Sequence, residues 1–271
     1  MIELSEECLV QENRASSKGN QLKWQQNGVW YKADYTGYEG LTEYLVSHLF
    51  RFCPLSSENY VLYETEEIRY KKSIYRGCRS RDFLSGSWQC ITLERLYRNH
   101  TGESLYKTIW SEPDVARRIV LLLSIVKDLT GLKDFAAYLY QALLLDAVFL
   151  NEDRHYHNIA VLMDGKGCFA YCPFFDFGAS LLSDTTQDYP MGTDIHDLIP
   201  DVHAKTVSQS FDEQLDAMES IYDGGMKFGF RYGDVRDLLD REPYYPKEIK
   251  ARILDIVMEQ RRRYAAYFRD A

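Results

Sequence analysis

One stretch of this sequence, residues 151–158, reads Asn151-Glu152-Asp153-Arg154-His155-Tyr156-His157-Asn158. It follows an apolar run with helical character and precedes a run typical of a β-strand. Asn158 comes five residues after Asp153. Phosphoryl transfer requires a carboxylate beside the attacking hydroxyl and oxygen ligands for Mg²⁺, and kinase catalytic loops supply them as Asp and Asn at this spacing. The stretch therefore indicates phosphoryl-transfer chemistry.

A further acidic residue comes at the end of the hairpin that follows. We expect strands at 159–163 and 168–175, joined by a turn at Asp164-Gly165-Lys166-Gly167. The second strand leads into Phe175-Asp176-Phe177-Gly178, in which Asp176 comes eighteen residues after Asn158. A hairpin of this length returns the chain to its starting point. Asp176 is therefore predicted to bind the same metal ion as Asn158.

A lysine on an early strand completes the charged set. Asn27-Gly28 is a strong signal for a type I′ turn between strands at 22–26 and 29–34, and Lys32 lies on the second strand. A lysine in such a position neutralises ATP phosphates and needs an acidic partner. Glu39 and Glu43, on a predicted helix at 38–51, are the candidates. Glu43 is the better one because it lies inside the helix.

Just before that hairpin, the segment Ser16-Ser17-Lys18-Gly19-Asn20-Gln21-Leu22-Lys23 is a candidate phosphate-binding loop. It has one glycine and lacks the G-x-G-x-x-G pattern, so alone it is a weak signal. Each of these elements also has an ordinary interpretation as a turn, a cap or a solvent-facing residue. Their order along the chain favours the catalytic interpretation.

The remaining patterns predict an α+β fold with two lobes. Residues 1–96 form a β-rich lobe with the phosphate loop, the Lys32 strand and one helix, and residues 97–271 form a mainly helical lobe with Asp153 and Asp176. Further strands are expected at 60–64, 68–75 and 88–93, and further helices at 115–129, 133–150, 211–222, 232–239 and 246–268.

Composition and local patterns speak against several other classes of protein. The chain of 271 residues is 45% hydrophobic and has a formal net charge of −9, which speaks against direct nucleic-acid binding. The first residues lack the basic and apolar pattern of a secretory signal, and the longest apolar runs are too short for a membrane span or are interrupted by Asp146. Six cysteines form no C-x-x-C pair and predict reduced thiols. We expect a cytoplasmic protein without membrane contact.

Taken together, these elements resemble the HipA-like kinases, the catalytic components of many bacterial toxin–antitoxin systems. The resemblance covers residues 14–220 and is carried by the segments 16–23, 29–34, 93–96, 151–158 and 175–181. Its most specific part is Asp153-Arg154-His155-x-x-Asn158 with the later Asp176.

The resemblance implies a two-lobed, protein-kinase-like α+β fold that uses ATP and Mg²⁺ to phosphorylate Ser or Thr of a protein. It implies that Asp153 is the catalytic base, with Arg154 and Lys32 as further catalytic residues, and that Asn158 and Asp176 hold Mg²⁺. The nucleotide-contacting set that it implies is Ser17, Lys18, Gly19, Asn20, Gln21, Lys32, Glu43, Glu94, Arg95, Leu96, His155, Asn158 and Asp176, with adenine against the backbone of Glu94–Leu96. Relatives often autophosphorylate on a phosphate-loop serine, for which Ser16 and Ser17 are the candidates here.

Longer family members carry an additional N-terminal subdomain, and this chain resembles the shorter forms. A partner is therefore expected, either an antitoxin or a separately encoded subdomain, besides an unidentified protein substrate. Two rivals share the catalytic residues: a kinase acting on a small molecule or lipid, and a nucleotide-binding pseudokinase scaffold. The segment 179–210 occupies the activation-segment position, and its residues indicate no function of their own.

Overall fold

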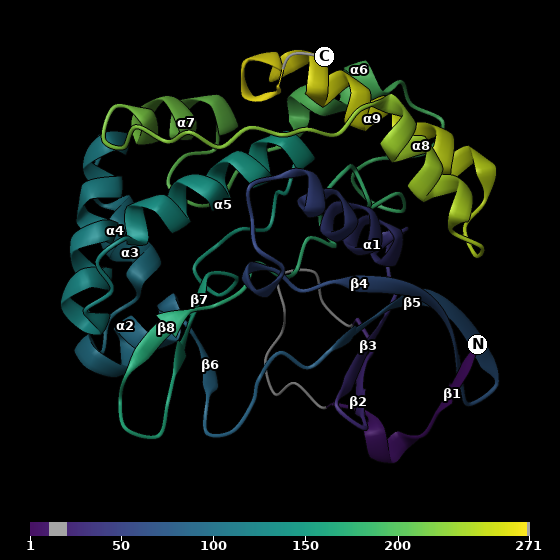
Figure 1. Cartoon of the computed structure of the whole chain (residues 1–271), viewed down its shortest axis with the longest axis horizontal. Helices are drawn as coiled ribbons and strands as arrows, with labels where there is room; N and C mark the ends of the chain where they lie inside the picture. Colours follow the sequence, from purple (N-terminus) through teal and green to yellow (C-terminus); the bar gives the residue numbers. More distant parts are fainter. Residues whose placement is uncertain (11–20, 270–271) are drawn as a thin grey trace. The chain divides into compact units, whose positions relative to one another are not determined.

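The computed structural model describes residues 1–10 and 21–269, which form an α+β fold (Figure 1). The strands are β1 (Ile2–Leu4), β2 (Lys23–Gln26), β3 (Val29–Ala33), β4 (Tyr63–Tyr70), β5 (Ser73–Arg81), β6 (Gln89–Thr92), β7 (Ala160–Met163) and β8 (Phe169–Tyr171). The α-helices are α1 (Glu39–Leu49), α2 (Leu93–Thr101), α3 (Leu105–Trp110), α4 (Val115–Thr130), α5 (Phe135–Phe149), α6 (Ile195–Leu198), α7 (Phe211–Glu219), α8 (Tyr232–Arg241) and α9 (Lys247–Arg263).

The chain divides into two compact units. Unit 1 comprises Met1–Phe83, Phe175–Val202 and Lys227–Ala271, and unit 2 comprises Leu84–Phe174 and His203–Met226. Each unit is therefore built from stretches that are distant in the sequence. The lobe boundary expected at Leu96 stays a prediction, since these units change over at Leu84.

A curled five-stranded sheet in the order β1-β4-β5-β3-β2 forms the base of unit 1 (Figure 1). The Asn27-Gly28 turn joins β2 to β3 as predicted, with both residues at positive φ, the conformation that a type I′ turn requires. Every second residue faces a core that contains Trp24, Tyr31 and Ile68. Lys32 consequently points to the opposite face from Tyr31.

That opposite face of the sheet is covered by α1, and a pair of glycines allows the close approach. A Cβ atom on Gly40 would lie 2.4 Å from the backbone of Gly77 on β5, and one on Gly77 would lie 2.0 Å from the carbonyl oxygen of Lys32. Gly77 pairs with Ala33 in the sheet. Gly40 lets the helix approach β5, and Gly77 lets β5 approach β3, so the side chains of α1 lie close to the strand that carries Lys32.

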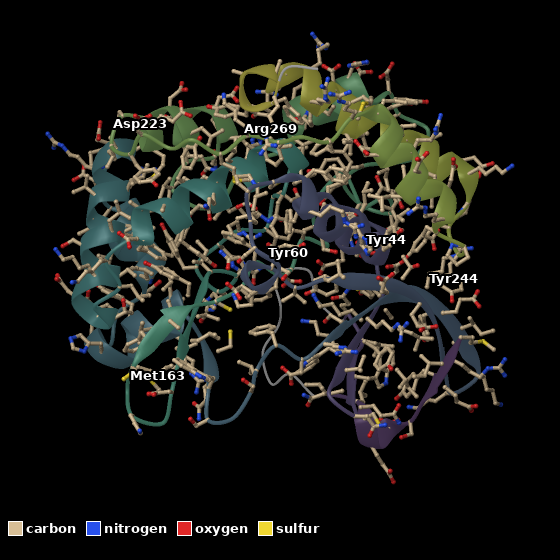
Figure 2. The ribbon with its side chains drawn as sticks, viewed as in Figure 1. Tyr44, Tyr60, Met163, Asp223, Tyr244 and Arg269 are labelled. Carbon is tan, nitrogen blue, oxygen red and sulfur yellow. The ribbon has the colours of Figure 1, made fainter. Side chains whose placement is uncertain are left out.

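Helices from the end of the chain complete unit 1. Tyr44 of α1, labelled in Figure 2, donates a hydrogen bond from its hydroxyl to the carbonyl of Leu238 on α8 at 3.2 Å. The guanidinium of Arg252 on α9 donates to the carbonyls of Tyr189 and Pro190, at 3.0 and 2.9 Å. The segment 179–210 is thereby attached to α9.

Unit 2 combines a helical cluster with a small sheet in the order β6-β7-β8. The helix α5 is buried along most of its length, as its nearly uniform apolar sequence predicts, and α7 contacts both α5 and α4. The loop 151–158 begins where α5 ends and leads directly into β7. The catalytic-loop candidate therefore stands on the most buried helix of the unit.

One local prediction is wrong, and several elements were not anticipated. The strand expected at 68–75 is instead the end of β4, a turn and the start of β5, because Lys71 adopts a φ of 56° without a Gly or Asn to signal it. The segment 93–96, where no helix was expected, forms the first turn of α2 after Thr92 as its N-cap. The strand β1 and the helix α3 were not anticipated at all.

Candidate active site

In unit 1, Lys32 lies between two carboxylates from distant parts of the chain. Its ammonium nitrogen is 2.8 Å from Glu43 Oε1 on α1 and 2.7 Å from Asp176 Oδ1. Glu43 is 2% exposed, Lys32 14% and Asp176 30% in their side chains. The cluster thus joins one fully buried acid, one shielded cation and one acid that reaches solvent.

The charges of this cluster stabilise one another. Burial opposes the charge of Lys32, but Asp176 and Glu43 outweigh it and hold the pKa of the ammonium well above its ordinary value. Burial raises the pKa of Glu43, an effect that the Lys32 ammonium and the Phe177 N–H oppose. Lys32 is therefore a permanent cation, suited to neutralise a phosphate group.

The backbone around Asp176 is fixed in an unusual conformation. Asp176 has a φ of 62°, in the left-handed region that few non-glycine residues adopt. The next residue, Phe177, donates its N–H to Glu43 Oε2 at 2.9 Å, and its buried ring packs edge-on against Phe50. These two contacts compensate the backbone strain and aim the Asp176 carboxylate at Lys32.

Glu39, the other glutamate considered as a partner for Lys32, has a structural role. Glu39 accepts hydrogen bonds from the N–H groups of Thr36 and Gly37, at 2.7 and 3.1 Å, and from the Thr36 hydroxyl at 2.9 Å. It thereby holds the loop that precedes the helix. Of the two glutamates weighed as partners for Lys32, the structure pairs the lysine with Glu43.

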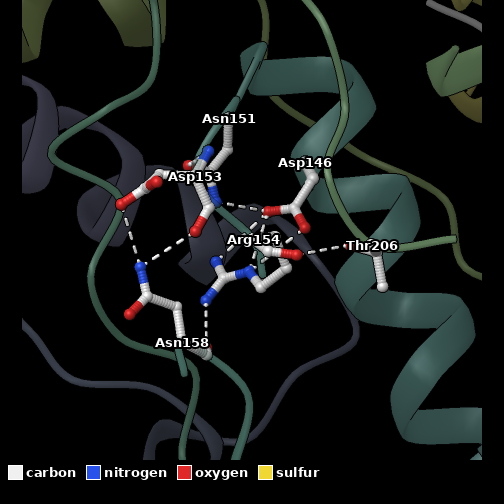
Figure 3. A network of polar contacts seen from close by, with 6 residues as sticks. All are labelled: Asp146, Asn151, Asp153, Arg154, Asn158 and Thr206. Carbon is white, nitrogen blue, oxygen red and sulfur yellow. Dashed lines mark hydrogen bonds and ion pairs between the residues drawn. The ribbon is translucent and has the colours of Figure 1, made fainter. Parts of the chain in front are cut away.

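In unit 2, Asp153 and Asn158 contact each other across the turn of the catalytic-loop candidate (Figure 3). The amide nitrogen of Asn158 donates to the Asp153 carboxylate at 3.1 Å and to the Asp153 carbonyl at 2.9 Å. The amide oxygen of Asn158 points away from Asp153, as Figure 3 shows. The five-residue spacing thus places a carboxylate and an outward-facing amide oxygen on one short loop.

Arg154 holds this loop on the helix beneath it. Its guanidinium donates to both carboxylate oxygens of Asp146 on α5, at 3.1 to 3.2 Å, and to the carbonyl of Asn158 at 3.0 Å. Asn151 also donates to Asp146, at 2.6 Å. Burial raises the pKa of Asp146, opposed by the Arg154 guanidinium and the Asn151 amide. Since Arg154 is 4% exposed, its contacts are those of a positioning residue.

Each unit offers an oxygen ligand of a kind that Mg²⁺ accepts when it is bound together with a nucleotide. Mg²⁺ prefers oxygen ligands and is commonly bound through one or two carboxylates plus substrate phosphates. Asp176 and Asn158 offer oxygens of this kind. Within residues 1–10 and 21–269, no group of three or more His, Cys, Asp or Glu side chains is arranged to hold a metal without such help. His155 and His157 pack ring edge to ring face at 5.5 Å.

Most of the predicted phosphate-loop contacts cannot be placed in the structure. Ser16, Ser17, Lys18, Gly19 and Asn20 lie outside the described residues, and Gln21 directly precedes Leu22 and β2.

Glu94, Arg95 and Leu96 lie in the first turn of α2. The N–H of Glu94 donates to the Tyr156 carbonyl at 3.0 Å, and the N–H of Arg95 donates to the Thr92 hydroxyl at 3.3 Å. An adenine contact by this backbone stays a prediction, and it would have to use other atoms than these two donors.

The structure adds residues that the sequence did not indicate. Asp146 appeared in the sequence as an interruption of an apolar run, and a buried charge on an apolar helix is a signal that a partner exists. Lys205 and Thr206 gave no signal, because they follow a long irregular segment. In the structure, both residues contact the loop 151–158.

Comparisons with known proteins support the fold. A scan against family models finds no match, and neither does a search of curated proteins. Among solved structures, the Helicobacter pylori proinflammatory kinase CtkA aligns with a TM-score of 0.60 and 15% identity, over 96% of this chain and 94% of that chain. The chain has the fold of this kinase.

The α+β, kinase-like fold that the sequence predicts is thereby confirmed. HipA of Shewanella oneidensis MR-1, solved with HipB and operator DNA, aligns with a TM-score of 0.44 and 11% identity, over 97% of this chain and 68% of that chain. In the part of the chain that the structure describes, no helix is long and apolar enough to cross a membrane.

Proposed function

We propose that this chain is an ATP- and Mg²⁺-dependent kinase that phosphorylates Ser or Thr of a protein. The observation that carries the proposal is Lys32 held at 2.8 Å by Glu43 and at 2.7 Å by Asp176. In protein kinases, a strand lysine paired with a helix glutamate and an aspartate of the D-F-G type together prepare the phosphates of ATP for transfer. The motif order and the fold support the same function.

The chemistry divides among the named residues. Lys32 neutralises the phosphates, and Asp153 orients the acceptor hydroxyl and takes its proton. Asn158 and Asp176 would hold Mg²⁺, which when bound offsets the charge of the triphosphate. Arg154 keeps Asp153 and Asn158 in place through its contacts with Asp146 and the Asn158 carbonyl. Most of the rate enhancement then comes from positioning and electrostatics.

Regulation and partners follow from the resemblance alone. Ser16 and Ser17 are the proposed autophosphorylation sites, in a loop where added negative charge would compete with ATP phosphates. An antitoxin, or a separately encoded N-terminal subdomain, is the proposed partner. The toxin–antitoxin role belongs to this proposal as well.

The experiment is incubation of the wild-type chain and Asp153→Ala with Mg-ATP, followed by intact-mass analysis and phosphopeptide mapping. We expect phosphate on the wild type at Ser16 or Ser17, and a loss of rate of at least about a hundredfold in Asp153→Ala, because a general base contributes this much or more. Asp216→Ala, an exposed aspartate on α7 of the same unit, is the matched control and should keep the wild-type rate.

Other results point to the rivals. Phosphate on an added aminoglycoside or inositol lipid, with none on protein, would replace the protein acceptor by a small molecule or lipid. Nucleotide binding without turnover towards any acceptor would indicate a scaffold. Wild-type activity in Asp153→Ala would contradict the assignment of the base.

A further inference from the structure

A lysine far from the catalytic loop in sequence lies beside its aspartate. The ammonium nitrogen of Lys205 is 3.7 Å from Asp153 Oδ1, with the two side chains 43% and 12% exposed. His155 Nε2 lies 3.7 Å from the same oxygen. Lys205 belongs to the irregular segment between α6 and α7, and both partners are in unit 2. None of the motifs in the sequence assigns a role to this lysine.

The backbone next to Lys205 is fixed to the catalytic loop and to α4. The hydroxyl of Thr206 donates to the Arg154 carbonyl at 2.7 Å, a contact drawn in Figure 3, and the hydroxyl of Tyr156 donates to the Thr206 carbonyl at 2.8 Å. Arg118 on α4 donates to the Val207 carbonyl at 2.8 Å. Thr206 is 1% exposed and Val207 is fully buried. Lys205 therefore extends from a rigid anchor toward Asp153.

The stability of the ion pair does not explain this arrangement. A pair as exposed as this one contributes about 1 kcal/mol at most, whereas the anchor buries three hydrogen bonds. Arg154, the arginine of the loop itself, donates to Asp146 and to a backbone carbonyl beneath the loop. Lys205 is thus a cation from a distant part of the sequence that lies beside the Asp153 carboxylate, with its side chain partly exposed to solvent.

We infer that Lys205 is a catalytic residue whose ammonium contacts the phosphoryl group as that group passes from ATP to the acceptor hydroxyl. The inference rests on the proposed kinase function. A hydroxyl held by Asp153 at hydrogen-bond distance lies next to the carboxylate oxygen that Lys205 approaches. The flexible stem of the lysine lets the ammonium turn from that oxygen to a phosphoryl oxygen.

The transfer step balances without any change at Lys205. The acceptor oxygen forms a bond to the γ-phosphorus while the bond from that phosphorus to the β,γ-bridging oxygen breaks. The bridging oxygen keeps the electron pair and leaves with ADP, and the hydroxyl proton goes to Asp153. Lys205 stays protonated throughout and offsets the charge on the non-bridging oxygens, an interaction that is strongest in the transition state.

The test compares Lys205→Met, Lys205→Arg and wild type, with Lys133→Ala as an exposed-lysine control from the same unit. Rates of phosphoryl transfer are measured against ATP concentration, and Mg-ADP binding is measured separately by calorimetry. We expect kcat to fall about a hundredfold in Lys205→Met with KM for ATP and ADP affinity within about threefold of wild type. Lys205→Arg should recover at least about tenfold of this loss, because it restores the charge.

Each alternative outcome is decisive. If the wild type transfers phosphate and Lys205→Met keeps kcat within threefold, the inference is wrong while the kinase function stands. If Lys205→Arg is as slow as Lys205→Met although both bind ADP and unfold at the wild-type temperature, the charge is not what matters and the inference also fails. If the wild type transfers no phosphate to any acceptor, the proposed function fails and this inference with it.

Discussion

At the scale of single residues, Lys32 has to balance the charge of a buried acid and also remain accessible to a ligand. A fully buried carboxylate such as Glu43 is costly unless a cation accompanies it, and the cation at the same time has to remain accessible to a ligand. Asp176, which is 30% exposed, lies on the other side of Lys32 and reaches solvent. The ammonium is thus fixed by an interior acid and shared with a more exposed one.

Removing the Lys32 charge should reveal this dependence in the stability of the fold. Lys32→Met leaves Glu43 buried without its cation, and we expect the free energy of unfolding to fall by about 3 kcal/mol. Adding Glu43→Gln should restore part of the loss, giving a coupling energy of at least about 1 kcal/mol. Urea unfolding of the four members of the cycle measures this, and strictly additive losses would contradict the pairing.

At the scale of elements, the approach of α1 to β5 determines where Glu43 lies. Gly77→Ala places a methyl group 2.0 Å from the carbonyl oxygen of Lys32 on the neighbouring strand β3, so β5 or β3 has to move, and with it the surface against which α1 packs. We expect a loss of about 2 kcal/mol in stability from this overpacking and a loss of kinase activity beyond that caused by unfolding. Chemical denaturation and initial rates on the folded fraction measure the two effects.

The matched control for Gly77→Ala is Gly233→Ala on α8. A Cβ atom at Gly233 meets no described atom within 4 Å, so alanine should be neutral or stabilise the helix by up to about 1 kcal/mol. Equal behaviour of the two variants would show that the close contact at Gly77 does not matter.

Prediction from sequence succeeded for elements whose signals are local. Asn27-Gly28 dictates the β2–β3 turn through its positive φ values, and the Gly131 C-cap ends α4 as expected. The turn at Lys71 was not predicted, because the residue in the left-handed conformation there is a lysine rather than Gly or Asn. The helix α2 was missed although Thr92 and Gly102 cap it, because a strand was expected up to residue 93 and no helix after it.

The proposed site rests on signals of the same local kind. Asp153, Asn158 and Asp176 were selected because phosphoryl transfer requires such residue types at such spacing, and a strand lysine followed by a helix glutamate is a similarly local pattern. The partner of Arg154 was not predictable, since Asp146 reaches it only after α5 is packed. Lys205 depends on the course of the chain after α6, which no short-range pattern records.

At the scale of the whole molecule, one acid connects the β3–α1 region of unit 1 to a distant stretch near the end of the chain. Asp34, at the end of β3, accepts hydrogen bonds from the Gly40 N–H at 2.7 Å and from the Tyr245 hydroxyl at 2.7 Å. Burial, followed by the charge of Glu39, raises the pKa of Asp34 to about 7, while Tyr245, Gly40 and Arg76 oppose the rise. The carboxyl thus titrates near neutral pH.

The sign of its effect on stability follows from linkage. Between the ordinary value of 3.8 and about 7, folded Asp34 holds a proton that the unfolded chain has released, so the contribution of this group to stability falls as pH rises through that window, by at most about 4 kcal/mol. Asp34→Asn should therefore show a flatter dependence of unfolding free energy on pH between 4 and 8 than the wild type. Urea titrations at several pH values measure this, and parallel curves for the two proteins would contradict the assignment.

The interleaving of the two units has a consequence for synthesis of the protein. The unit that holds Lys32 and Asp176 begins at Met1 and takes its last stretch from Lys227–Ala271. A nascent chain on the ribosome cannot assemble this unit until α8 and α9 have left the exit tunnel, because contacts such as Tyr44 with Leu238 join its two ends. Translation that stalls before residue 227 therefore leaves a chain that carries every proposed catalytic residue yet lacks the helices that complete the unit of Lys32 and Asp176.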